Sequence, residues 1–163
     1  MKQFIQRRQL LGAGACSIGL ALFGPRVAQA ARPLKFEMEL TPAEWRKRLP
    51  LDRYRVLRQA ATESPGSSPL NKEHRAGTFT CAGCNLPLFA STTKFESHTG
   101  WPSFFRALPN ATVTRVDRSL NPERTEVLCR RCGGHLGHVF RDGPRPTGLR
   151  YCMNGLALQF VAA

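Results

Sequence analysis

Apolar and polar positions recur with two different periods along this chain, and the change of period divides it into two parts. Over residues 52–61 the apolar side chains recur at helical spacing, which predicts a short helix. The string from Thr41 to Glu44 is a capping box with proline at the first helical position, so a helix is expected to begin there. It is expected to end at Pro50, and a second helix is expected over residues 52–61 with Asp52 as its cap.

After Gly77 the pattern changes to short runs of β-branched, aromatic and aliphatic residues separated by Gly, Pro and Asn. Such runs are typical of strands joined by tight turns. Residues 64–75, rich in Pro, Gly, Ser and charge, predict a loop before the strands. The chain is therefore expected to fold as a small, mainly β, antiparallel domain preceded by short helices. The strands are expected at residues 78–80, 86–90, 112–117, 126–128, 136–140 and 156–161.

The first 30 residues have a pattern of their own. A basic start is followed by an apolar stretch over residues 10–23 and by small residues at 28–30, which are the three regions of an export signal. Arg7 and Arg8 before this stretch are typical of a twin-arginine signal, which in bacteria serves proteins that are exported already folded. We therefore expect a signal peptide over residues 1–30, an extended leader over 31–40, the folded domain over 41–163 and a periplasmic location.

Two other interpretations of this segment stay open. Arg7 and Arg8 could be incidental to an ordinary Sec signal, and Cys16 could carry a lipid, although the apolar stretch before it is short. The apolar stretch of 14 residues is too short to span a membrane comfortably, and no later apolar segment is longer. No stable membrane insertion is expected after cleavage.

Composition and charge narrow the class of protein. Of 163 residues, 42% are hydrophobic and 21% charged, which indicates one globular domain and excludes a disordered or fibrous chain. The net charge is +13, and 20 basic and 11 acidic residues, or +9, remain beyond residue 30. This excess could attract an anionic partner such as nucleic acid. Acidic residues are interleaved with the basic ones, however, so a solvated basic surface is the simpler interpretation.

Cysteine spacing gives the strongest chemical signal. Cys81 and Cys84 form one CxxC pair, and Cys129 and Cys132 form a second pair after 44 intervening residues. Two such pairs are the usual way to offer four thiolates to a tetrahedral Zn²⁺, because each turn places two sulfurs on one side. We therefore expect one structural zinc ion. In an oxidising compartment the pairs could instead form disulfides, and a redox-active CxxC is a third interpretation.

Cys152 remains as the odd cysteine of the mature chain. Such a residue is either a reactive thiol or a partner for another chain. His135 and His138 precede it by 17 and 14 residues, and Arg150 is two residues away; these groups could favour a thiolate and supply protons. Cys152 could equally be an inert residue of a buried strand. The histidines could be metal ligands, but the four cysteines already complete a tetrahedron.

Several longer strings follow one another in a fixed order and spacing. They are Cys-Ala-Gly-Cys at residues 81–84, Gly-Trp-Pro-Ser-Phe at 100–104, Gly-His-Leu-Gly-His-Val-Phe at 134–140 and Arg-Tyr-Cys-Met-Asn at 150–154. In these strings the chain resembles the peptide methionine-R-sulfoxide reductase B family over residues 41–160. The resemblance implies two antiparallel β sheets in a tent-like or barrel-like arrangement, short N-terminal helices, a structural zinc site and reduction of the R epimer of methionine sulfoxide in peptides and proteins.

The resemblance also implies catalytic roles for three residues. Cys152 would be the nucleophile, because a thiolate can attack the electrophilic sulfur of a sulfoxide and become a sulfenic acid. The oxygen must be protonated for this step, so an acid must stand beside the nucleophile. His138, with His135 beside it, would be that acid.

Five further residues would complete the site according to the same resemblance. Arg150 and Asn154 would position it, and Asp142 would hold either the histidines or Arg150. Trp101 and Phe104 would bind the substrate. Trp101 would form an apolar wall against the S-methyl group, which offers nothing to hydrogen-bond; a core tryptophan is the simpler alternative.

The chain departs from the family pattern at a position with chemical consequences. Many relatives have a resolving cysteine just before residues 100–104, whereas this sequence has Thr99. With four cysteines assigned to zinc and Cys16 removed with the signal, no resolving thiol remains. We therefore expect a thioredoxin-like or other external thiol to reduce the sulfenic acid. Departures at His98 and at residues 155–158 leave the fine substrate preference open.

Two other classes of function account for parts of the sequence. A zinc-ribbon module that binds nucleic acid would explain the CxxC pairs and the basic residues at 46–48 and 130–131. An exported structural or adhesive protein would explain the signal. Neither explains the arrangement of residues from His135 to Cys152, and an export signal would send the protein away from nucleic acid. We therefore expect an oxidoreductase without a nucleic-acid partner.

Overall fold

The three-dimensional structure is a computed structural model that describes residues 34–119 and 121–163. The expected export signal, its cleavage site after Ala30 and the first part of the leader lie outside the described residues. Leu34–Ala163 cluster as one unit. Among the helices that the structure describes, none is both long and apolar enough to cross a membrane.

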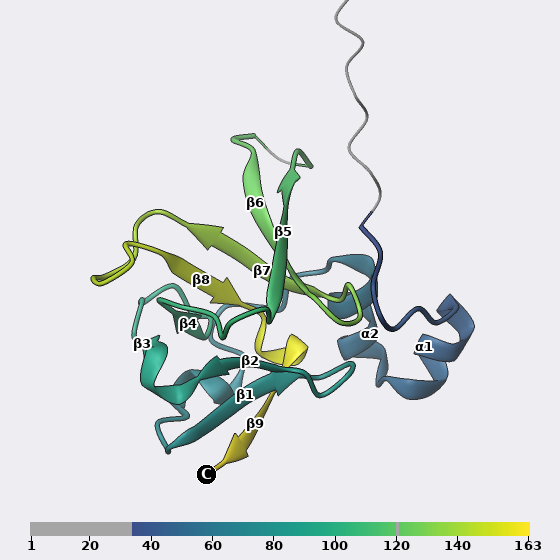
Figure 1. Cartoon of the computed structure of the whole chain (residues 1–163), viewed down its shortest axis with the longest axis horizontal. Helices are drawn as coiled ribbons and strands as arrows, with labels where there is room; N and C mark the ends of the chain where they lie inside the picture. Colours follow the sequence, from purple (N-terminus) through teal and green to yellow (C-terminus); the bar gives the residue numbers. More distant parts are fainter. Residues whose placement is uncertain (1–33, 120) are drawn as a thin grey trace, which may run out of the picture. The chain divides into compact units, whose positions relative to one another are not determined.

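The first helix begins where the local sequence predicts (Figure 1). α1 covers Pro42–Arg48, and both halves of its capping box are formed. The backbone N–H of Glu44 donates to Thr41 Oγ1, and the N–H of Thr41 donates to the Glu44 carboxylate at 2.7 Å. These bonds satisfy backbone donors that have no partner within the helix. The capping prediction is therefore confirmed.

The second helix, α2, covers Leu51–Gln59 and begins one residue before the expected start. Its N-cap is Pro50, so the prediction that Asp52 caps this helix was wrong. Asp52 lies instead in the first turn, where a negative charge favours the positive end of the helix. A short 3₁₀ helix, η1, covers Pro69–Lys72 in the segment predicted as a loop.

The strands form two antiparallel sheets, which confirms the expected fold class (Figure 1). The smaller sheet has the order β2-β1-β9, and the larger sheet has the order β3-β4-β8-β7-β6-β5. Two more 3₁₀ helices, η2 (Ser91–Thr93) and η3 (Gly155–Ala157), precede β3 and β9. The strands are β1 Gly77–Cys81, β2 Pro87–Ala90, β3 Lys94–Phe95, β4 Ser103–Phe104, β5 Thr112–Asp117, β6 Arg124–Cys129, β7 His135–Phe140, β8 Arg150–Met153 and β9 Leu158–Ala162.

Six of the nine described strands were expected from the sequence, and three were missed. β5 has the expected bounds, and β1, β2, β6 and β7 overlap their expected ranges. β9 starts two residues late because η3 occupies residues 155–157. β3, β4 and β8 were missed. β3 and β4 have two residues each, and the burial of β8 does not alternate along the strand.

Aromatic side chains join the two sheets. Phe104 of β4 stacks on Phe89 of β2 with ring centroids 4.4 Å apart, and it meets the edge of Phe79 of β1 at 4.9 Å. All three rings are fully buried. Burial of each such side chain contributes roughly 1.5–3 kcal/mol. Phe104, expected to bind substrate, therefore lies in the core that holds the sheets together.

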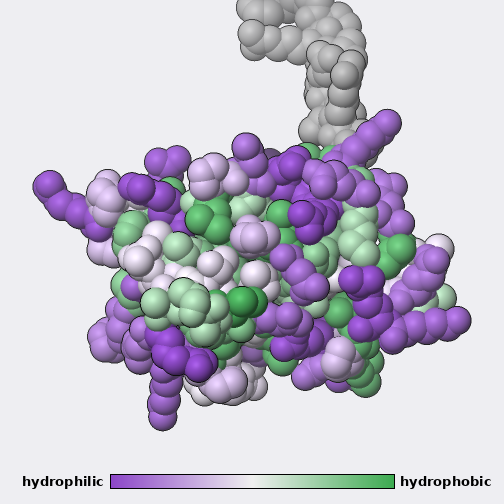
Figure 2. All heavy atoms as spheres, turned by 60° about the horizontal axis from the view of Figure 1, so that its bottom comes forward, coloured by the Kyte–Doolittle hydropathy of each residue, from purple (hydrophilic) through white to green (hydrophobic). Residues whose placement is uncertain are grey.

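Hydrophilic side chains cover much of the face shown in Figure 2, with smaller apolar areas between them. Among the described residues the exposed large apolar side chains come from different parts of the chain, and scattered exposure of this kind is ordinary for globular proteins. These residues are Leu34, Leu51, Val116 and Val161.

Candidate active site

The four cysteines of the CxxC pairs meet between the two sheets. Cys81 and Cys84 border the turn after β1, and Cys129 and Cys132 border the turn after β6. In each turn the backbone N–H of the residue after the second cysteine donates to the carbonyl of the first. That residue has a left-handed conformation, with φ of 61° at Asn85 and 67° at Gly133. The two turns therefore have the same spacing and the same backbone hydrogen bond.

The sulfurs of this cluster lie close enough to hold one metal ion. All four are within 4.8 Å of one another, and all four residues are buried. Cys81 and Cys132 Sγ are 3.7 Å apart, and Cys84 and Cys129 Sγ are 3.5 Å apart. These distances are much longer than a disulfide bond of about 2.05 Å. The geometry therefore favours metal binding over the disulfide interpretation.

Arginine side chains attach the N-terminal helices to the cysteine turns. Arg48 of α1 donates to the carbonyl of Gly83 at 3.1 Å, and Arg58 of α2 donates to the carbonyl of Cys132 at 2.9 Å. A cluster of thiolates carries negative charge, so the guanidinium groups also offset part of that charge. The helices therefore belong to the metal site as well as to the core.

Cys152 lies apart from this cluster, in the middle of the larger sheet. In the antiparallel register of β7 and β8, His138 is directly opposite Cys152. Directly opposite residues point their side chains to the same face of the sheet. The strands approach so closely here that a Cβ at Gly137 would lie 2.1 Å from the carbonyl oxygen of Cys152. Only glycine fits at that position.

A small pocket opens over this pair. Its volume is about 120 Å³, below the range of about 300–1,000 Å³ that is usual for whole small-molecule ligands. It therefore suits a group about as large as an amino-acid side chain. The lining residues are Thr62, Trp101, Arg124, Gly137, His138, Phe140, Cys152 and Asn154.

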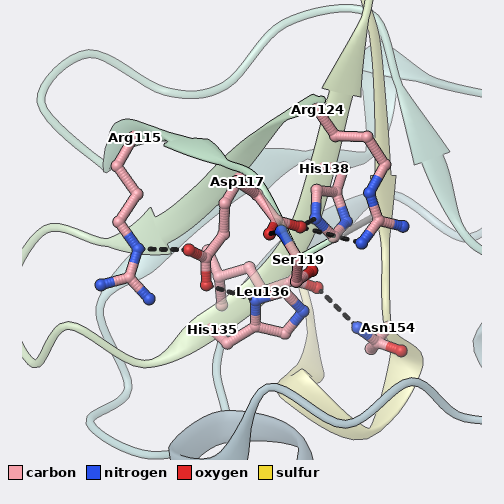
Figure 3. A network of polar contacts seen from close by, with 9 residues as sticks. Arg115, Asp117, Ser119, Arg124, His135, Leu136, His138 and Asn154 are labelled. Carbon is pink, nitrogen blue, oxygen red and sulfur yellow. Dashed lines mark hydrogen bonds and ion pairs between the residues drawn. The ribbon is translucent and has the colours of Figure 1, made fainter. Parts of the chain in front are cut away.

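His138 is held by a carboxylate that the sequence analysis did not identify. Its Nε2 donates to Asp117 Oδ2 at 2.8 Å, and Arg124 donates to the same oxygen (Figure 3). Burial lowers the pKa of His138, although the bond to Asp117 opposes this effect. Hydrogen bonds from Ser119, His138 and Arg124 lower the pKa of Asp117. The carboxylate therefore stays charged and fixes the ring.

His135 has a parallel arrangement on the same face. Its Nδ1 donates to Glu126 Oε1 at 2.7 Å, and Arg115 pairs with the other oxygen of Glu126 (Figure 3). Burial alone raises the pKa of Glu126, but the bonds from His135 and Arg115 outweigh it, and the pKa is lowered. His135 does not line the pocket of Cys152; it lines a separate cavity with Leu57 and Arg115.

A β-bulge brings the two histidines to one face. Residues three apart in a regular strand point to opposite faces. The register between β6 and β7 shifts at Val127/Leu128, so that Glu126 is opposite His138 while Leu128 is opposite His135. The extra residue in β7 reverses the direction of His135. The two rings consequently lie with centroids 5.5 Å apart.

The remaining predicted site residues lie on both sides of Cys152. Arg150 makes two hydrogen bonds to Asp142, at 2.9 and 2.8 Å, and these bonds raise the pKa of Arg150. Of the two expectations for Asp142, the pair with Arg150 is the one that the structure shows; Asp117 and Glu126 hold the histidines instead. Trp101 and Asn154 line the pocket, whereas Phe104 is in the core.

Thr99 occupies the place next to the thiol. Its Oγ1 lies 3.7 Å from Cys152 Sγ, and Ser97 links it to Ser103 through hydroxyl contacts of 2.9 and 2.7 Å. Thr99 and Arg150 also line a separate groove that does not include Cys152. The sulfur therefore has a hydroxyl on one side and the histidine pocket on the other.

The fold and these two centres define a class of protein: a two-sheet β protein with a four-cysteine metal site and a separate cysteine–histidine pocket. Residues 49–162 match the SelR domain. The chain is 48% identical over 128 residues to "Peptide methionine sulfoxide reductase MsrB" of Leptospira interrogans, covering 78% of this chain and 98% of the relative. The proteins of the same name from Herminiimonas arsenicoxydans and Methanosarcina barkeri are 53% and 50% identical over 75% and 76% of this chain, and over 90% and 87% of their own lengths.

The chain therefore belongs to the peptide methionine sulfoxide reductase B family, a family of oxidoreductases. This membership confirms the family resemblance drawn from the sequence strings. Family membership alone does not assign the roles of the individual pocket residues.

Proposed function

We propose that this protein reduces the R epimer of methionine sulfoxide in peptides and proteins to methionine. The observation that carries the proposal is the cross-strand pair of Cys152 and His138 beneath a side-chain-sized pocket walled by Trp101, in a chain of this family. The indole supplies an apolar surface for the S-methyl group. The ring of His138 supplies a proton at the opposite wall.

The first chemical step uses the thiolate of Cys152 as nucleophile. It attacks the sulfoxide sulfur, the oxygen takes a proton from His138, and the oxygen is transferred to Cys152 as the sulfenic acid while methionine leaves. Because Asp117 accepts from Nε2, the protonated ring has Nδ1–H as the donor for the substrate. A positioned acid of this kind contributes about 10²–10⁴-fold to the rate.

The second stage requires a thiol from outside the chain. Among the described residues the cysteines other than Cys152 all belong to the metal cluster, and Thr99 is the side chain next to its sulfur. An external thiolate attacks the sulfenic acid, which releases water and forms a mixed disulfide. A second thiol then releases the reduced enzyme. A thioredoxin-like protein is the proposed donor of both thiols.

The metal in the cysteine cluster is proposed to be zinc. Tetrahedral Zn²⁺ with Zn–S bonds of about 2.3 Å places its sulfurs about 3.8 Å apart. The contacts of 3.7 and 3.5 Å between Cys81 and Cys132 and between Cys84 and Cys129 are close to this edge length. Four buried thiolates leave no open position for substrate, so the ion would supply stability and not catalysis.

Export to the periplasm is part of the proposal. It is supported by the basic start, the apolar stretch over residues 10–23 and the small residues at 28–30. Exported proteins with exposed methionines would then be the substrates. Sequencing of the amino terminus of protein recovered from the periplasmic fraction is expected to give Ala31 as the first residue. Recovery of the uncleaved chain from the cytoplasm would refute the export proposal.

The reaction is tested with separated R and S epimers of a peptide methionine sulfoxide and dithiothreitol as reductant. We expect the metal-loaded protein to consume the R epimer alone. The Cys152→Ser variant should be inactive, with an unchanged unfolding temperature and metal content that show an intact fold. Turnover of the S epimer, or retained activity in the variant, would refute the assignment.

A further inference from the structure

Glu63 lies behind the wall of the Cys152 pocket and is 8% exposed. It follows α2 in a segment that belongs to neither sheet. Its carboxylate accepts two backbone hydrogen bonds, from Gly155 N–H at 2.6 Å and from Leu156 N–H at 2.9 Å. Among the ion pairs of residues 34–119 and 121–163 there is none that includes Glu63. Two backbone N–H groups therefore hold this buried carboxyl group in place.

The backbone of Glu63 holds two side chains that line the pocket. Its carbonyl oxygen accepts a hydrogen bond from Trp101 Nε1 at 3.2 Å, and its N–H donates to Asn154 Oδ1 at 3.0 Å. Asn154 in turn donates through both its backbone N–H and its side-chain amide to the carbonyl of Leu136 in β7. The preceding residue, Thr62, lines the pocket itself.

The segment packs closely against η3, the 3₁₀ helix that follows β8. A Cβ at Gly155 would lie 1.9 Å from Ser68 Oγ and 3.2 Å from Glu63 Oε1. Ser68 is buried as well. The segment is therefore pressed against the turn that follows Cys152, and the carboxylate of Glu63 makes the bonds that fix its position.

We infer that Glu63 is a positioning residue that sets the distance between the Trp101 wall and Cys152, and so the fit of the substrate's S-methyl group. It does not line the pocket, so it acts through Trp101, Asn154 and Thr62 and contacts no substrate. The carboxylate anchors the segment to η3, which follows β8, and the backbone of the same residue anchors Trp101 to the segment. The kinetic consequence rests on the proposed function; the effect on Trp101 does not.

The test uses Glu63→Gln and Glu63→Asp in the metal-loaded protein. Glutamine keeps the size but turns an amide donor toward one of the two N–H groups, and aspartate keeps the charge but reaches less far. Because the wall binds the methyl group equally in the ground state and the transition state, KM for the R epimer should rise about tenfold in both variants while kcat changes little. Glu73→Gln, which makes the same change in a surface pair with Arg75, should leave KM unchanged.

Tryptophan fluorescence gives a readout that needs no turnover. The sequence has only Trp45 and Trp101, and Trp45→Phe leaves Trp101 as the single reporter. Trp45 Nε1 is buried without a hydrogen-bond partner among the described residues, so phenylalanine loses no such bond there. In this background the Glu63 variants should make Trp101 more accessible to acrylamide.

Leu88→Ala is the control for a general loss of stability, because it opens a cavity in the core of the smaller sheet. This variant should lower the unfolding temperature without changing KM or the quenching of Trp101. Unchanged KM and quenching in both Glu63 variants would overturn the inference, as would an equal rise of KM in Leu88→Ala. If the wild-type protein failed to reduce either epimer, the proposed function would fail while the quenching experiment still decided the role of Glu63.

Discussion

Replacement of Thr99 by cysteine is expected to convert the external reductive step into an internal one. Thr99 Oγ1 lies 3.7 Å from Cys152 Sγ, in the segment between β3 and β4. Reacting atoms in a productive arrangement are about 3–3.5 Å apart. A thiol introduced at this position would therefore need to move by only about 0.2–0.7 Å, the difference between these distances.

The size of the effect follows from this proximity. Groups joined by a short flexible linker already reach an effective concentration in the millimolar range, and two side chains held side by side in one folded chain exceed it. At about 0.1 mM dithiothreitol, closure of the internal disulfide should therefore outcompete the external thiol by about tenfold or more.

Intact-mass analysis after one turnover without reductant distinguishes the two outcomes. The wild-type protein should gain about 16 Da as the sulfenic acid of Cys152. The Thr99→Cys variant should lose about 2 Da relative to its reduced form, because the introduced thiol displaces the oxygen as water and closes a disulfide. Titration of free thiols should show the loss of one in the wild type and of two in the variant.

Thr92→Cys provides the matched control, because it makes the same change at an exposed position of η2. It should behave as the wild type. The reasoning would be refuted if Thr99→Cys produced one equivalent of methionine and still retained the sulfenic acid. An internal disulfide in the wild-type protein would equally contradict the proposal that the thiol comes from outside.

Three further predictions concern the metal and the histidines. Cys84→Ser should release the metal and remove a large part of the roughly 10 kcal/mol that structural zinc can contribute to folding; thermal unfolding and metal analysis check this, and an unchanged unfolding temperature would contradict it. His138→Gln should lower kcat by about 10²–10⁴-fold, whereas His74→Gln, at an exposed histidine, should not. Asp117→Asn removes the interaction that raises the pKa of His138 against burial. The protonated fraction then falls at a given pH, so the alkaline limb of the rate profile should move to lower pH, and a move to higher pH would argue against His138 as the acid.

Features that depend on neighbouring residues could be predicted from the sequence. The capping box of α1 joins Thr41 to Glu44 within one turn, and the two CxxC turns each close within a few residues. The second helix shows where local reasoning fails. Asp52 is a good cap by residue type, but Pro50 already has the extended backbone that precedes a helix, and it takes the N-cap position.

Features that depend on strand register could not be predicted. Asp117 and His138 are 21 residues apart, and they meet because β5, β6 and β7 pair in one particular register. The bulge that turns His135 to the same face as His138 has no clear local signature. One partial signal was available: Arg115 and Asp117 alternate within the expected strand 112–117, which places both on one face. Arg124 lies outside the expected strand 126–128, and only the register of β5 with β6 brings it and Glu126 to the same face.

Backbone contacts are a second source of failure. Glu63 holds Trp101 through its carbonyl group and Asn154 through its N–H, and both groups are main-chain atoms that any residue carries. The identity of a residue does not reveal which contacts its main chain makes. The short strands β3 and β4 were missed for a related reason, because two residues are too few to show any alternation.

Strands β5 and β6 carry the charged side chains that hold both histidines. Arg115, Asp117, Arg124 and Glu126 all belong to these two strands, whereas the nucleophile and both histidines come from later strands. Substitutions at residues 113–119 and 121–128 can therefore change the pKa of His138, the proposed acid, while Cys152 and the four clustered cysteines stay unchanged.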